Sequence, residues 1–497
     1  MSSLHLALDL GAGSGRALLG SLTPDGVLLR EVHRFRYDPR RTGGHLRWDM
    51  ARLTAGLREG IARAAAEAAA LGRPLVSTGV DSWGVDYGLV DEEGRLVEEP
   101  VCYRDERTGA VMDDVFARVP RDELFALTGI QVLPLNTLFQ LAAHAREGLP
   151  PEAARLLMMP DVCHQLLCGS RVTELTNAST TQLLRADRTG WSDEVFERLG
   201  LPRALMPGIV PAGTRLGALS PEWRAATGAG ALDVIAPATH DTGSAVAGTP
   251  LEAGWAYISS GTWSLLGVEL DRPLVNEDVA RANFTNEAGA AGNTRFLKNV
   301  MGLWILESCR REWDRAGAAL PYDELLGRAG AFSGFPGVLF PDDPRFFNPP
   351  SMLEAVRASL SEQGRPPYED PVVLTRVVLD SLALRYASLI RTIESLTGRP
   401  VPGIHIVGGG SLNAYLNQAT ADASGLPVVA GPAEATALGN LAIQAMAAGQ
   451  IGGLDEARRQ LAAHLPLCRI EPRHVKAWQA AAVEYEQVER AVRHRAL

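Results

Sequence analysis

The sequence predicts an α/β protein built from two halves, followed by a helical tail. Its 497 residues suffice for two or three domains with sizeable cores. Two segments, residues 4–35 and 256–270, each read as a strand, a turn of small residues and a second strand. A third, residues 404–424, reads as an apolar strand, three glycines and a helix. The expected divisions are residues 1–238, 239–450 and 451–497.

The first hairpin contains a glycine-rich turn directly after a carboxylate. Gly11, Gly13 and Gly15 follow Asp9, and RALLGSL, TPDG and VLLREVHRF then read as strand, turn and strand. Backbone N–H groups in such a turn can point together at phosphate oxygens. Asp9, at the end of its strand, is suited to hold Mg²⁺ through water. The alternative, a plain glycine-rich hairpin, stays open from these residues alone.

Two common nucleotide motifs are excluded. The glycine spacing differs from the GxGxxG that opens a helix in dinucleotide-binding proteins. The chain has only two lysines, Lys298 and Lys476, and neither follows a GxxxxG sequence, so there is no P-loop.

The next stretch, VDSWGVDYGLV, contains Asp81, Trp83, Gly84 and Asp86. Alternation along a strand would place Asp81 and Trp83 on one face and Gly84 and Asp86 on the other. An aromatic plate beside carboxylates and a close backbone is typical of a sugar site. The alternative is a strand with one buried tryptophan and aspartates paired within the protein.

Several segments read as scaffold. Residues 49–72, which are rich in alanine, predict a long helix, and residues 456–465 and 477–497 predict amphipathic helices in the tail. Residues 201–235 and 334–350, which are rich in proline and glycine, predict loops.

His240, Asp241 and Thr242 follow LDVIAPAT, an apolar run that reads as a strand. A carboxylate at this strand end could accept a proton from a substrate hydroxyl. The alternative is that Asp241 caps the helix that GSAVAG begins.

The order of the three turn-containing segments resembles the phosphate 1, phosphate 2 and adenosine motifs of the actin-like ATPase superfamily. That resemblance implies two ribonuclease-H-like α/β domains flanking a deep cleft, with ATP phosphates held by backbone amides and a metal ion.

A narrower resemblance is to the FGGY carbohydrate kinases, and it runs from about Leu6 to about Gln444. It rests on STGVDSWGVDYGLVDEEGRLV, PVCYRDERT, TGIQVLPLNTLFQL, LLMMPDVCHQLLCG, ELTNASTTQLL, ATHDTGSAVAGTP, ISSGTWSLLG, FLKNVMGLWILES and AGPAEATALGN. The pairs WGVDY with NTLFQL and THDT with KNVMGLW are typical of one branch of that family. The last fifty or so residues match weakly.

This resemblance implies ATP-dependent phosphorylation of a small ketose, with Mg²⁺ as the cofactor and Asp9 near the metal. It implies that Asp241 is the catalytic base. Sugar contacts are then expected at Gly84, His240, Asp241 and Thr242, with Trp83 and Asp86 beside them. The residues expected to bind ATP are Ala12, Gly13, Ser14, Gly15, Arg16, Thr262, Asn299, Glu307, Gly409 and Gly410.

The resemblance favours L-rhamnulose as the sugar, with L-fuculose, L-xylulose and L-ribulose as alternatives. A rival of another class is an actin-like ATPase without a sugar substrate, which would not need Asp241. Arg16 could bind a phosphate or form a structural ion pair. Glu307 departs from the family, which often carries glutamine at this position, so the contact on the purine side is in question.

Composition and charge limit the classes of partner that this protein is expected to bind. Net charge is −10 and is spread along the chain, which argues against nucleic acid or an anionic membrane as the main partner. No apolar run reaches the length of a membrane span, and the N-terminus lacks the pattern of a secretory signal. Five scattered cysteines indicate reduced thiols. We therefore expect a cytoplasmic enzyme; an oligomer is possible, and the sequence does not assign one.

Overall fold

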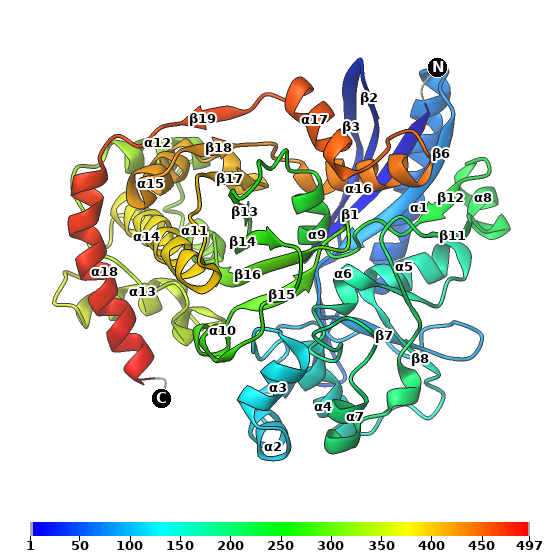
Figure 1. The fold of residues 1–497 in the computed structure, drawn as a ribbon, viewed down its shortest axis with the longest axis horizontal. Helices are drawn as coiled ribbons and strands as arrows, with labels where there is room; N and C mark the ends of the chain where they lie inside the picture. Colours follow the sequence, from blue (N-terminus) through cyan, green and yellow to red (C-terminus); the bar gives the residue numbers. More distant parts are fainter. Residues whose placement is uncertain (1–2, 496–497) are drawn as a thin grey trace. The chain divides into compact units, whose positions relative to one another are not determined.

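The structure, a computed structural model, describes residues 3–495 and divides the chain into two compact units. The first unit combines the chain up to Pro250 with Glu269–Phe296 and Ala435–Leu465. The second combines Leu251–Val268 and Leu297–Glu434 with the chain from Pro466 onward. This division differs from the three consecutive segments that we expected, 1–238, 239–450 and 451–497, because two late segments pack with the first unit (Figure 1).

A six-stranded sheet forms the centre of the first unit, in the order β11-β12-β6-β1-β2-β3. Its strands are β1 (Leu4–Gly11), β2 (Ser14–Thr23), β3 (Gly26–Arg36), β6 (Leu75–Ser82), β11 (Arg215–Ala218) and β12 (Asp233–Ile235). β1 pairs antiparallel with β2, with Gly11 opposite Ser14, and β2 pairs antiparallel with β3. The predicted glycine-rich hairpin is therefore confirmed. β1, β6 and β12 run parallel to one another.

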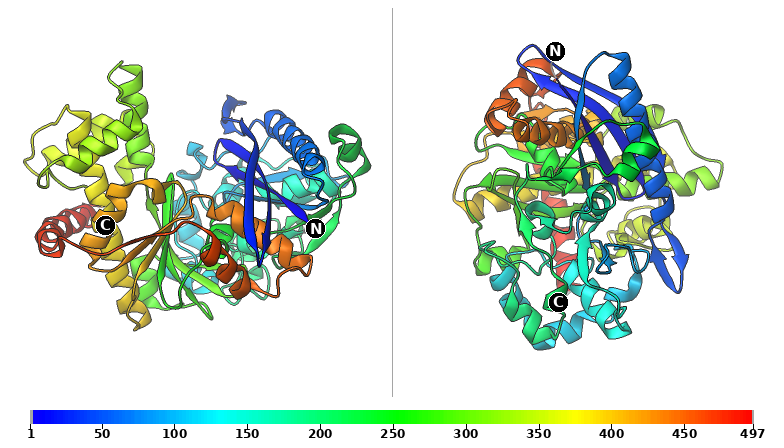
Figure 2. Two further views of the ribbon diagram at one scale, coloured as in Figure 1. Left: turned by 90° about the horizontal axis from the view of Figure 1, so that it is seen from above. Right: turned by 90° about the vertical axis from the view of Figure 1, so that its right-hand side faces the viewer.

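Helices cover both faces of this sheet. The predicted alanine-rich helix is α1 (Met50–Ala70), which Asp49 caps, and its Gly60 packs closely on Ala17 and Leu8. Ala7 and Leu18 point to the opposite face, where they pack against α16 (Ala435–Ala447) and α17 (Leu454–His464). Figure 2 shows these two late helices against the early strands. Burial of this second face explains why α16 belongs to the first unit.

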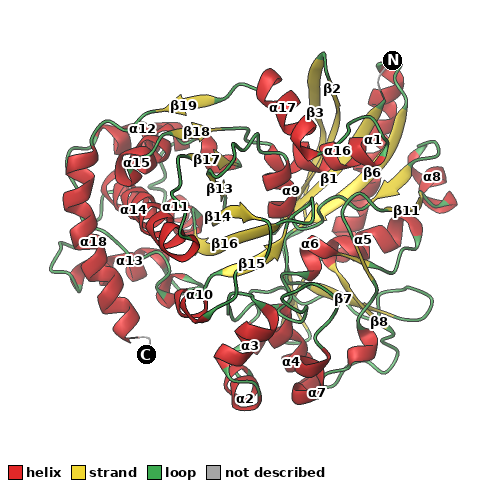
Figure 3. Ribbon diagram, in the orientation of Figure 1, coloured by secondary structure: helices red, strands yellow, loops and turns green. Residues whose placement is uncertain are grey.

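A second hydrophobic cluster of the first unit surrounds the two-stranded sheet of β7 (Tyr87–Val90) and β8 (Arg155–Met158). Figure 3 shows these two strands beside one another. The helices there are α2 (Met112–Arg118), α3 (Arg121–Thr128), α4 (Thr137–Glu147) and α7 (Asp193–Leu199). The remaining helices of the first unit are α5 (Met159–Cys168), α6 (Leu175–Ala178), α8 (Pro221–Thr227), α9 (Asp241–Ala247) and α10 (Glu277–Ala282), with 3₁₀ turns η1 (Glu106–Thr108) and η2 (Arg203–Leu205). Its shorter strands are β4 (Arg40–Thr42), β5 (His45–Arg47), β9 (Thr173–Glu174), β10 (Ile209–Val210) and β15 (Thr285–Ala288).

The second unit contains a sheet in which β14, β13, β17, β18 and β19 follow one another. Its elements include β13 (Ala256–Ser260), β14 (Trp263–Leu270), β17 (Ile404–Val407), β18 (Val428–Ala430), β19 (Cys468–Ile470), η4 (Gly409–Leu412) and α15 (Ala414–Ser424). β13 and β14 form an antiparallel hairpin, and the GGG turn joins β17 to α15. Both sequence predictions are confirmed.

The remaining elements of the second unit are mostly helical. They are α11 (Trp304–Arg315), α12 (Tyr322–Ala331), η3 (Pro344–Phe346), α13 (Met352–Ser361), α14 (Pro371–Thr397) and α18 (Val475–Arg495). β16 (Thr294–Met301) has residues in both units. The tail thus splits, because α17 packs with the first unit and α18 pairs its Glu489 with Arg385 of α14.

One sequence prediction is wrong in part. Residues 201–235 were expected to be loops, yet they contain α8, β11 and β12, because the short apolar runs pair with β6 and one another. Among the helices of residues 3–495, none combines the length and the hydropathy of a transmembrane segment.

Candidate active site

The carboxyl ends of neighbouring strands meet at one edge of the first sheet. Asp9 on β1 lies opposite Asp81 on the parallel strand β6. Ser82 forms a parallel bridge with His240, and its N–H donates to Thr239 O at 2.9 Å. The sequence segments that were singled out separately, around Asp9, Asp81 and Asp241, therefore end side by side. Polar groups at such an edge are typical of ligand sites in α/β proteins.

Asp241 is the first residue of α9, and His240 occupies the N-cap position without a side-chain capping bond. The alternative interpretation, that Asp241 caps the helix, is therefore wrong. Its Oδ1 accepts from the N–H of Thr242 at 2.5 Å and from the Thr242 hydroxyl at 3.1 Å. Within residues 3–495, no hydrogen-bond donor reaches Oδ2, and the side chain is 31% exposed. One carboxylate oxygen is thus left for another partner.

Burial of the Asp241 carboxyl and the negative charge near it both favour its neutral form. Removal from water raises the pKa of Asp241, and the nearby charge of Asp9 raises it further, while His240 acts in the opposite direction. A base with a raised pKa binds a proton more readily than an ordinary aspartate does.

Asp81 lies deeper and is paired with the late helix α16. Its Oδ2 accepts from Asn440 Nδ2 at 2.6 Å, and Asn440 Oδ1 accepts from Gln444 Nε2 at 2.6 Å. Burial, together with the charge of Asp9, holds the pKa of Asp81 well above its usual range. Asn440 and Gln444 were missed in the sequence, although two polar residues four positions apart in the apolar stretch LGNLAIQAM are a signal of a buried contact.

Asp9 forms an ion pair with Arg16, which lies opposite it across the β1–β2 hairpin. Of the two roles weighed for Arg16, the structural ion pair is the one present here. Ala12 and Ser14 at the turn are exposed, Gly13 is half-buried, and Gly15 is buried against Phe35. The hydroxyl of Tyr37 donates to the carbonyl oxygens of Gly11 and Ser14, which anchors both sides of the turn.

The donor set suits a cation held mainly by non-protein oxygens. Among residues 3–495, no group of three or more His, Cys, Asp or Glu side chains gathers that could hold a metal ion. Asp9 still offers a carboxylate at the strand end. Mg²⁺ usually keeps several waters and binds through one or two carboxylates and substrate phosphates, so Asp9 fits such a site.

Trp83 and Asp86 belong to one buried cluster. Asp86 Oδ2 accepts from Trp48 Nε1 at 2.7 Å, Trp83 Nε1 at 3.0 Å and Tyr103 N at 3.1 Å, and Oδ1 accepts from Gln140 Nε2 at 2.9 Å. Burial raises the pKa of Asp86 to about 6 in spite of these hydrogen bonds. The Trp48 and Trp83 rings lie 4.4 Å apart. Both oxygens of Asp86 thus have partners within the protein.

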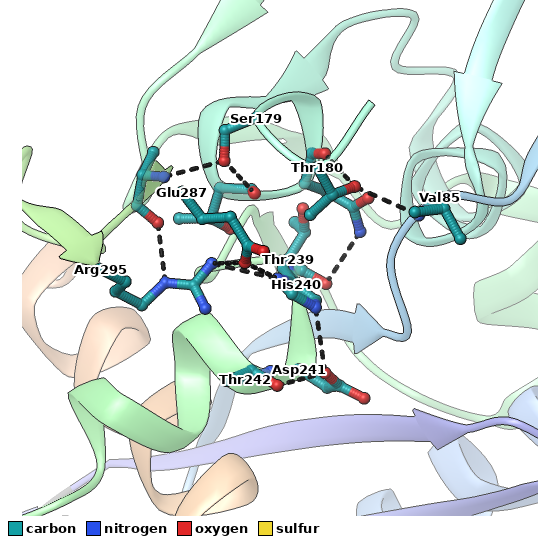
Figure 4. Close-up of polar contacts among 12 residues, drawn as sticks. Val85, Ser179, Thr180, Thr239, His240, Asp241, Thr242, Glu287 and Arg295 are labelled. Atoms are coloured by element: carbon teal, nitrogen blue, oxygen red, sulfur yellow. Dashed lines mark hydrogen bonds and ion pairs between the residues drawn. The ribbon is translucent and has the colours of Figure 1, made fainter. Parts of the chain in front are cut away.

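The backbone between Trp83 and Asp86 departs from the alternation expected of a strand. β6 ends at Ser82, and Val85 has a φ of +70°, which is rare for a β-branched residue. Val85 N donates to Thr180 Oγ1 at 3.2 Å (Figure 4), and its carbonyl accepts from Thr137 Oγ1 at 2.7 Å. A Cβ at Gly84 would lie 3.0 Å from Thr180 Oγ1, so Thr180 fills that side of Gly84. Strain of this kind clusters at ligand sites.

The imidazole of His240 faces a buried ion pair. Its Nδ1 lies 3.1 Å from Arg295 Nη2 and 3.3 Å from Glu287 Oε2, and its Nε2 lies 3.5 Å from Asp241 Oδ1 (Figure 4). Arg295 comes from the part of β16 that belongs to the first unit, and Glu287 comes from β15. Sequence reasoning missed both. For Arg295, the two charged residues within the otherwise mostly apolar strand TRFLKNVM are a signal.

Glu174 fixes the backbone of the same segment. Its carboxylate accepts from Thr239 N at 2.8 Å, Thr239 Oγ1 at 3.0 Å and Thr176 N at 2.9 Å. Thr176 Oγ1 in turn accepts from His240 N at 3.1 Å. Burial raises the pKa of Glu174 to about 6. The position of His240 and Asp241 therefore depends on residues far away in the sequence.

In the second unit, the expected nucleotide residues lie on two turns, a strand and a helix. Thr262 is exposed in the β13–β14 turn, and its carbonyl accepts from Trp304 N at 3.1 Å. Gly409 faces open space, whereas a Cβ at Gly410 would lie 2.0 Å from Ser260 Oγ. The GGG turn can therefore pack this closely on the β13–β14 turn only because Gly410 has no side chain.

Asn299 is half-buried on β16, beside Lys298, whose pKa burial lowers to about 7. Glu307 on α11 forms an ion pair with Arg310 at 2.9 Å. This pair offsets the negative charge that put the purine-side contact in question.

Comparison with known proteins places the chain in one family. The model of the N-terminal domain of the FGGY family of carbohydrate kinases matches residues 4–248, and the C-terminal domain model matches residues 256–448. A protein named rhamnulokinase from Bacteroides thetaiotaomicron is 40% identical over 98% of this chain and 99% of its own length. Another from Pectobacterium carotovorum is 42% identical over 94% of this chain and 93% of its own length.

A ligand-bound xylulose kinase from Lactobacillus acidophilus has the same two-domain α/β fold, with a TM-score of 0.80 and 14% identity over 99% of this chain and 98% of that one. The predicted fold class and family are therefore confirmed. With both family models and near-complete relatives in agreement, the chain belongs to the FGGY family of carbohydrate kinases.

Proposed function

We propose that this ATP-dependent sugar kinase converts L-rhamnulose to L-rhamnulose 1-phosphate, in the breakdown of L-rhamnose. The observation that supports the choice of sugar is the set of near-full-length relatives named rhamnulokinase, at about 40% identity. The observation that supports the chemistry is the available Oδ2 of Asp241 at the edge of the first sheet.

The reaction is an in-line phosphoryl transfer. The O1 hydroxyl of the ketose attacks the γ-phosphorus of ATP, a new O–P bond forms, and the bond to the β-phosphate oxygen breaks to release ADP. Asp241 accepts the hydroxyl proton through Oδ2. A positioned general base typically contributes about 10²–10⁴-fold to the rate.

The other site residues bind and orient. We assign the γ-phosphate to the turn from Ala12 to Arg16 and the nucleotide to Thr262, Asn299, Glu307, Gly409 and Gly410 of the second unit. Gly84, Trp83, Asp86, His240 and Thr242 are assigned to the sugar side. Mg²⁺, held near Asp9, would neutralise charge on the phosphate oxygens.

In this assignment, Asp86 acts on the sugar side indirectly, through Trp83. Because the Asp86 carboxylate already accepts four protein donors, we propose that it shapes the sugar side by fixing Trp83 rather than by a direct bond.

The test is ADP release in a coupled assay with Mg-ATP across L-rhamnulose, L-fuculose, L-xylulose, L-ribulose and glycerol, with Asp241→Asn alongside. We expect turnover that depends on L-rhamnulose and is lost in the variant. A preference for another ketose would replace the substrate and keep the chemistry. Turnover that needs no sugar and survives Asp241→Asn would favour an actin-like ATPase instead.

We also propose a cytoplasmic location, because the reaction uses ATP as co-substrate.

A further inference from the structure

We propose that Arg295 and Glu287 are positioning residues that hold the neutral ring of His240 with its proton on Nε2. This N–H then points toward Asp241 and is available to an oxygen of the sugar. The inference rests on the proposed function and deepens it, because it names residues that act on the reaction through His240 without touching the substrate.

The first step of the argument is burial. The Arg295 side chain is fully buried and Glu287 is almost so, and their charged groups lie 3.0 Å apart. A buried ion pair often adds little to stability, because desolvation of both ions offsets their attraction. Stability alone therefore does not explain why this pair lies against the ring of a site histidine.

The second step is the direction of the hydrogen bonds. A guanidinium group donates and never accepts, and it stays charged at any ordinary pH. Arg295 Nε donates to Ala288 O at 2.9 Å, which fixes the plane of the group, and Nη2 points at Nδ1 of His240 at 3.1 Å. Nδ1 must then accept, so the neutral ring carries its proton on Nε2. The 3.5 Å separation between Nε2 and Asp241 Oδ1 is long for a hydrogen bond, which leaves this N–H for a substrate oxygen.

The third step is competition for the same ring nitrogen. Glu287 Oε2 lies 3.3 Å from Nδ1 and could accept a proton from it, which would place the neutral ring in the other tautomer. Arg295 prevents this exchange by donating to Nδ1 and by occupying Glu287. Without Arg295, Glu287 would draw the proton to Nδ1 and leave a lone pair on Nε2.

Several charged groups surround the ring, and each bears on a pH experiment. Arg188 donates to Glu287 O at 3.3 Å, so its charge lies on the far side of the pair, and Asp9 acts on Asp241. The groups concerned are Glu287, Arg295, Arg188, Asp241 and Asp9.

The test is the pH dependence of kcat for ketose phosphorylation in Arg295→Gln relative to the unmodified enzyme, between pH 6 and 9. We expect a loss of about 10–100-fold at pH 8, by analogy with the loss caused by removing the second hydrogen-bond partner of a metal-bound histidine. The loss should shrink to a few-fold at pH 6. The reason is that a carboxylate beside an imidazole favours the doubly protonated ring as pH falls, and that ring again carries a proton on Nε2. The KM for the ketose should change less than kcat.

Glu174→Gln is the matched control. Glu174 is also buried and also holds this segment, but it contacts the backbone and hydroxyl groups of Thr176 and Thr239 and not the ring. Its variant should lower thermal stability and change kcat by the same factor from pH 7 to pH 9, above the Glu174 pKa of about 6. If Arg295→Gln does not fold, the double variant Arg295→Met with Glu287→Met removes both charges together. It should lose less than about tenfold in kcat at pH 8, below the range expected for Arg295→Gln, because no carboxylate then pulls the proton to Nδ1.

The outcomes separate the two proposals. An unmodified enzyme that phosphorylates the ketose, with an Arg295→Gln loss that is constant across pH or absent, would overturn the positioning role alone. For the double variant, a loss of more than about tenfold at pH 8 would do the same. An unmodified enzyme without any ketose-dependent turnover would overturn the proposed function and this role with it.

Discussion

Two short segments follow parallel strands of the same sheet, and each carries an aspartate that the sequence marks as a site residue. Asp86 follows β6 and Asp241 follows β12. Four protein donors saturate Asp86, whereas Asp241 keeps Oδ2 without a protein donor among the described residues. The difference teaches that a carboxylate beside a ligand site can be scaffold or reagent. The number of protein donors on its oxygens distinguishes the two.

The largest expected effect is on the reagent side of this comparison. Asp241→Asn removes the base while keeping the shape, so kcat should fall by about 10²–10⁴-fold. The coupled ADP assay measures the loss, and circular dichroism with thermal unfolding checks that the fold is unchanged. A variant that keeps more than a tenth of the activity would break the comparison, because Asp241 would then not be the base.

On the scaffold side of the comparison, substitution of Asp86 should lower the stability of the fold. Asp86→Ala leaves the indole N–H groups of Trp48 and Trp83 buried without an acceptor, which should cost about 2–4 kcal/mol of unfolding free energy. Urea unfolding measures it. If stability is unchanged and the KM for the ketose rises by more than tenfold, Asp86 binds the sugar directly and our assignment is wrong.

The pH profile sharpens the comparison further. Burial and Asp9 raise the pKa of Asp241, and the base acts only when it is deprotonated. Activity should therefore be present at neutral pH and lost as pH falls through this raised value, at a pH above that of an ordinary aspartate. The profile of kcat/KM for the ketose reports it, after stability at each pH has been checked. An acid limb at or below pH 3.8 would contradict the raised pKa.

The smallest effect is expected in the second unit. Glu307 pairs with Arg310 near the surface of α11, so Glu307→Gln should change the unfolding free energy by less than about 1 kcal/mol. We expect a change of a few-fold in the KM for ATP and no change in the KM for the ketose. Arg315→Gln, at an exposed position of the same helix, serves as the surface control. A shift in the ketose KM would show that Glu307 does not act on the nucleotide side.

Sequence patterns alone determined the local units and the family. The two hairpins, the GGG turn before a helix, the alanine-rich helix and the position of Asp241 after a strand were all predicted, because each depends on residues within about thirty positions. Glycine, proline and apolar periodicity carry this kind of information locally. The same motifs carried the resemblance to the FGGY family, which the comparisons confirm.

Only the tertiary structure decided which side chains surround the site. Asn440 reaches Asp81 from α16, and Arg295 and Glu287 reach His240 from two later strands. The sequence also did not reveal that protein donors occupy both oxygens of Asp86 or that Val85 has a strained φ. The physical reason is that hydrogen bonds and burial depend on atoms brought together across hundreds of residues, and no local pattern encodes which distant donor will meet a given carboxylate.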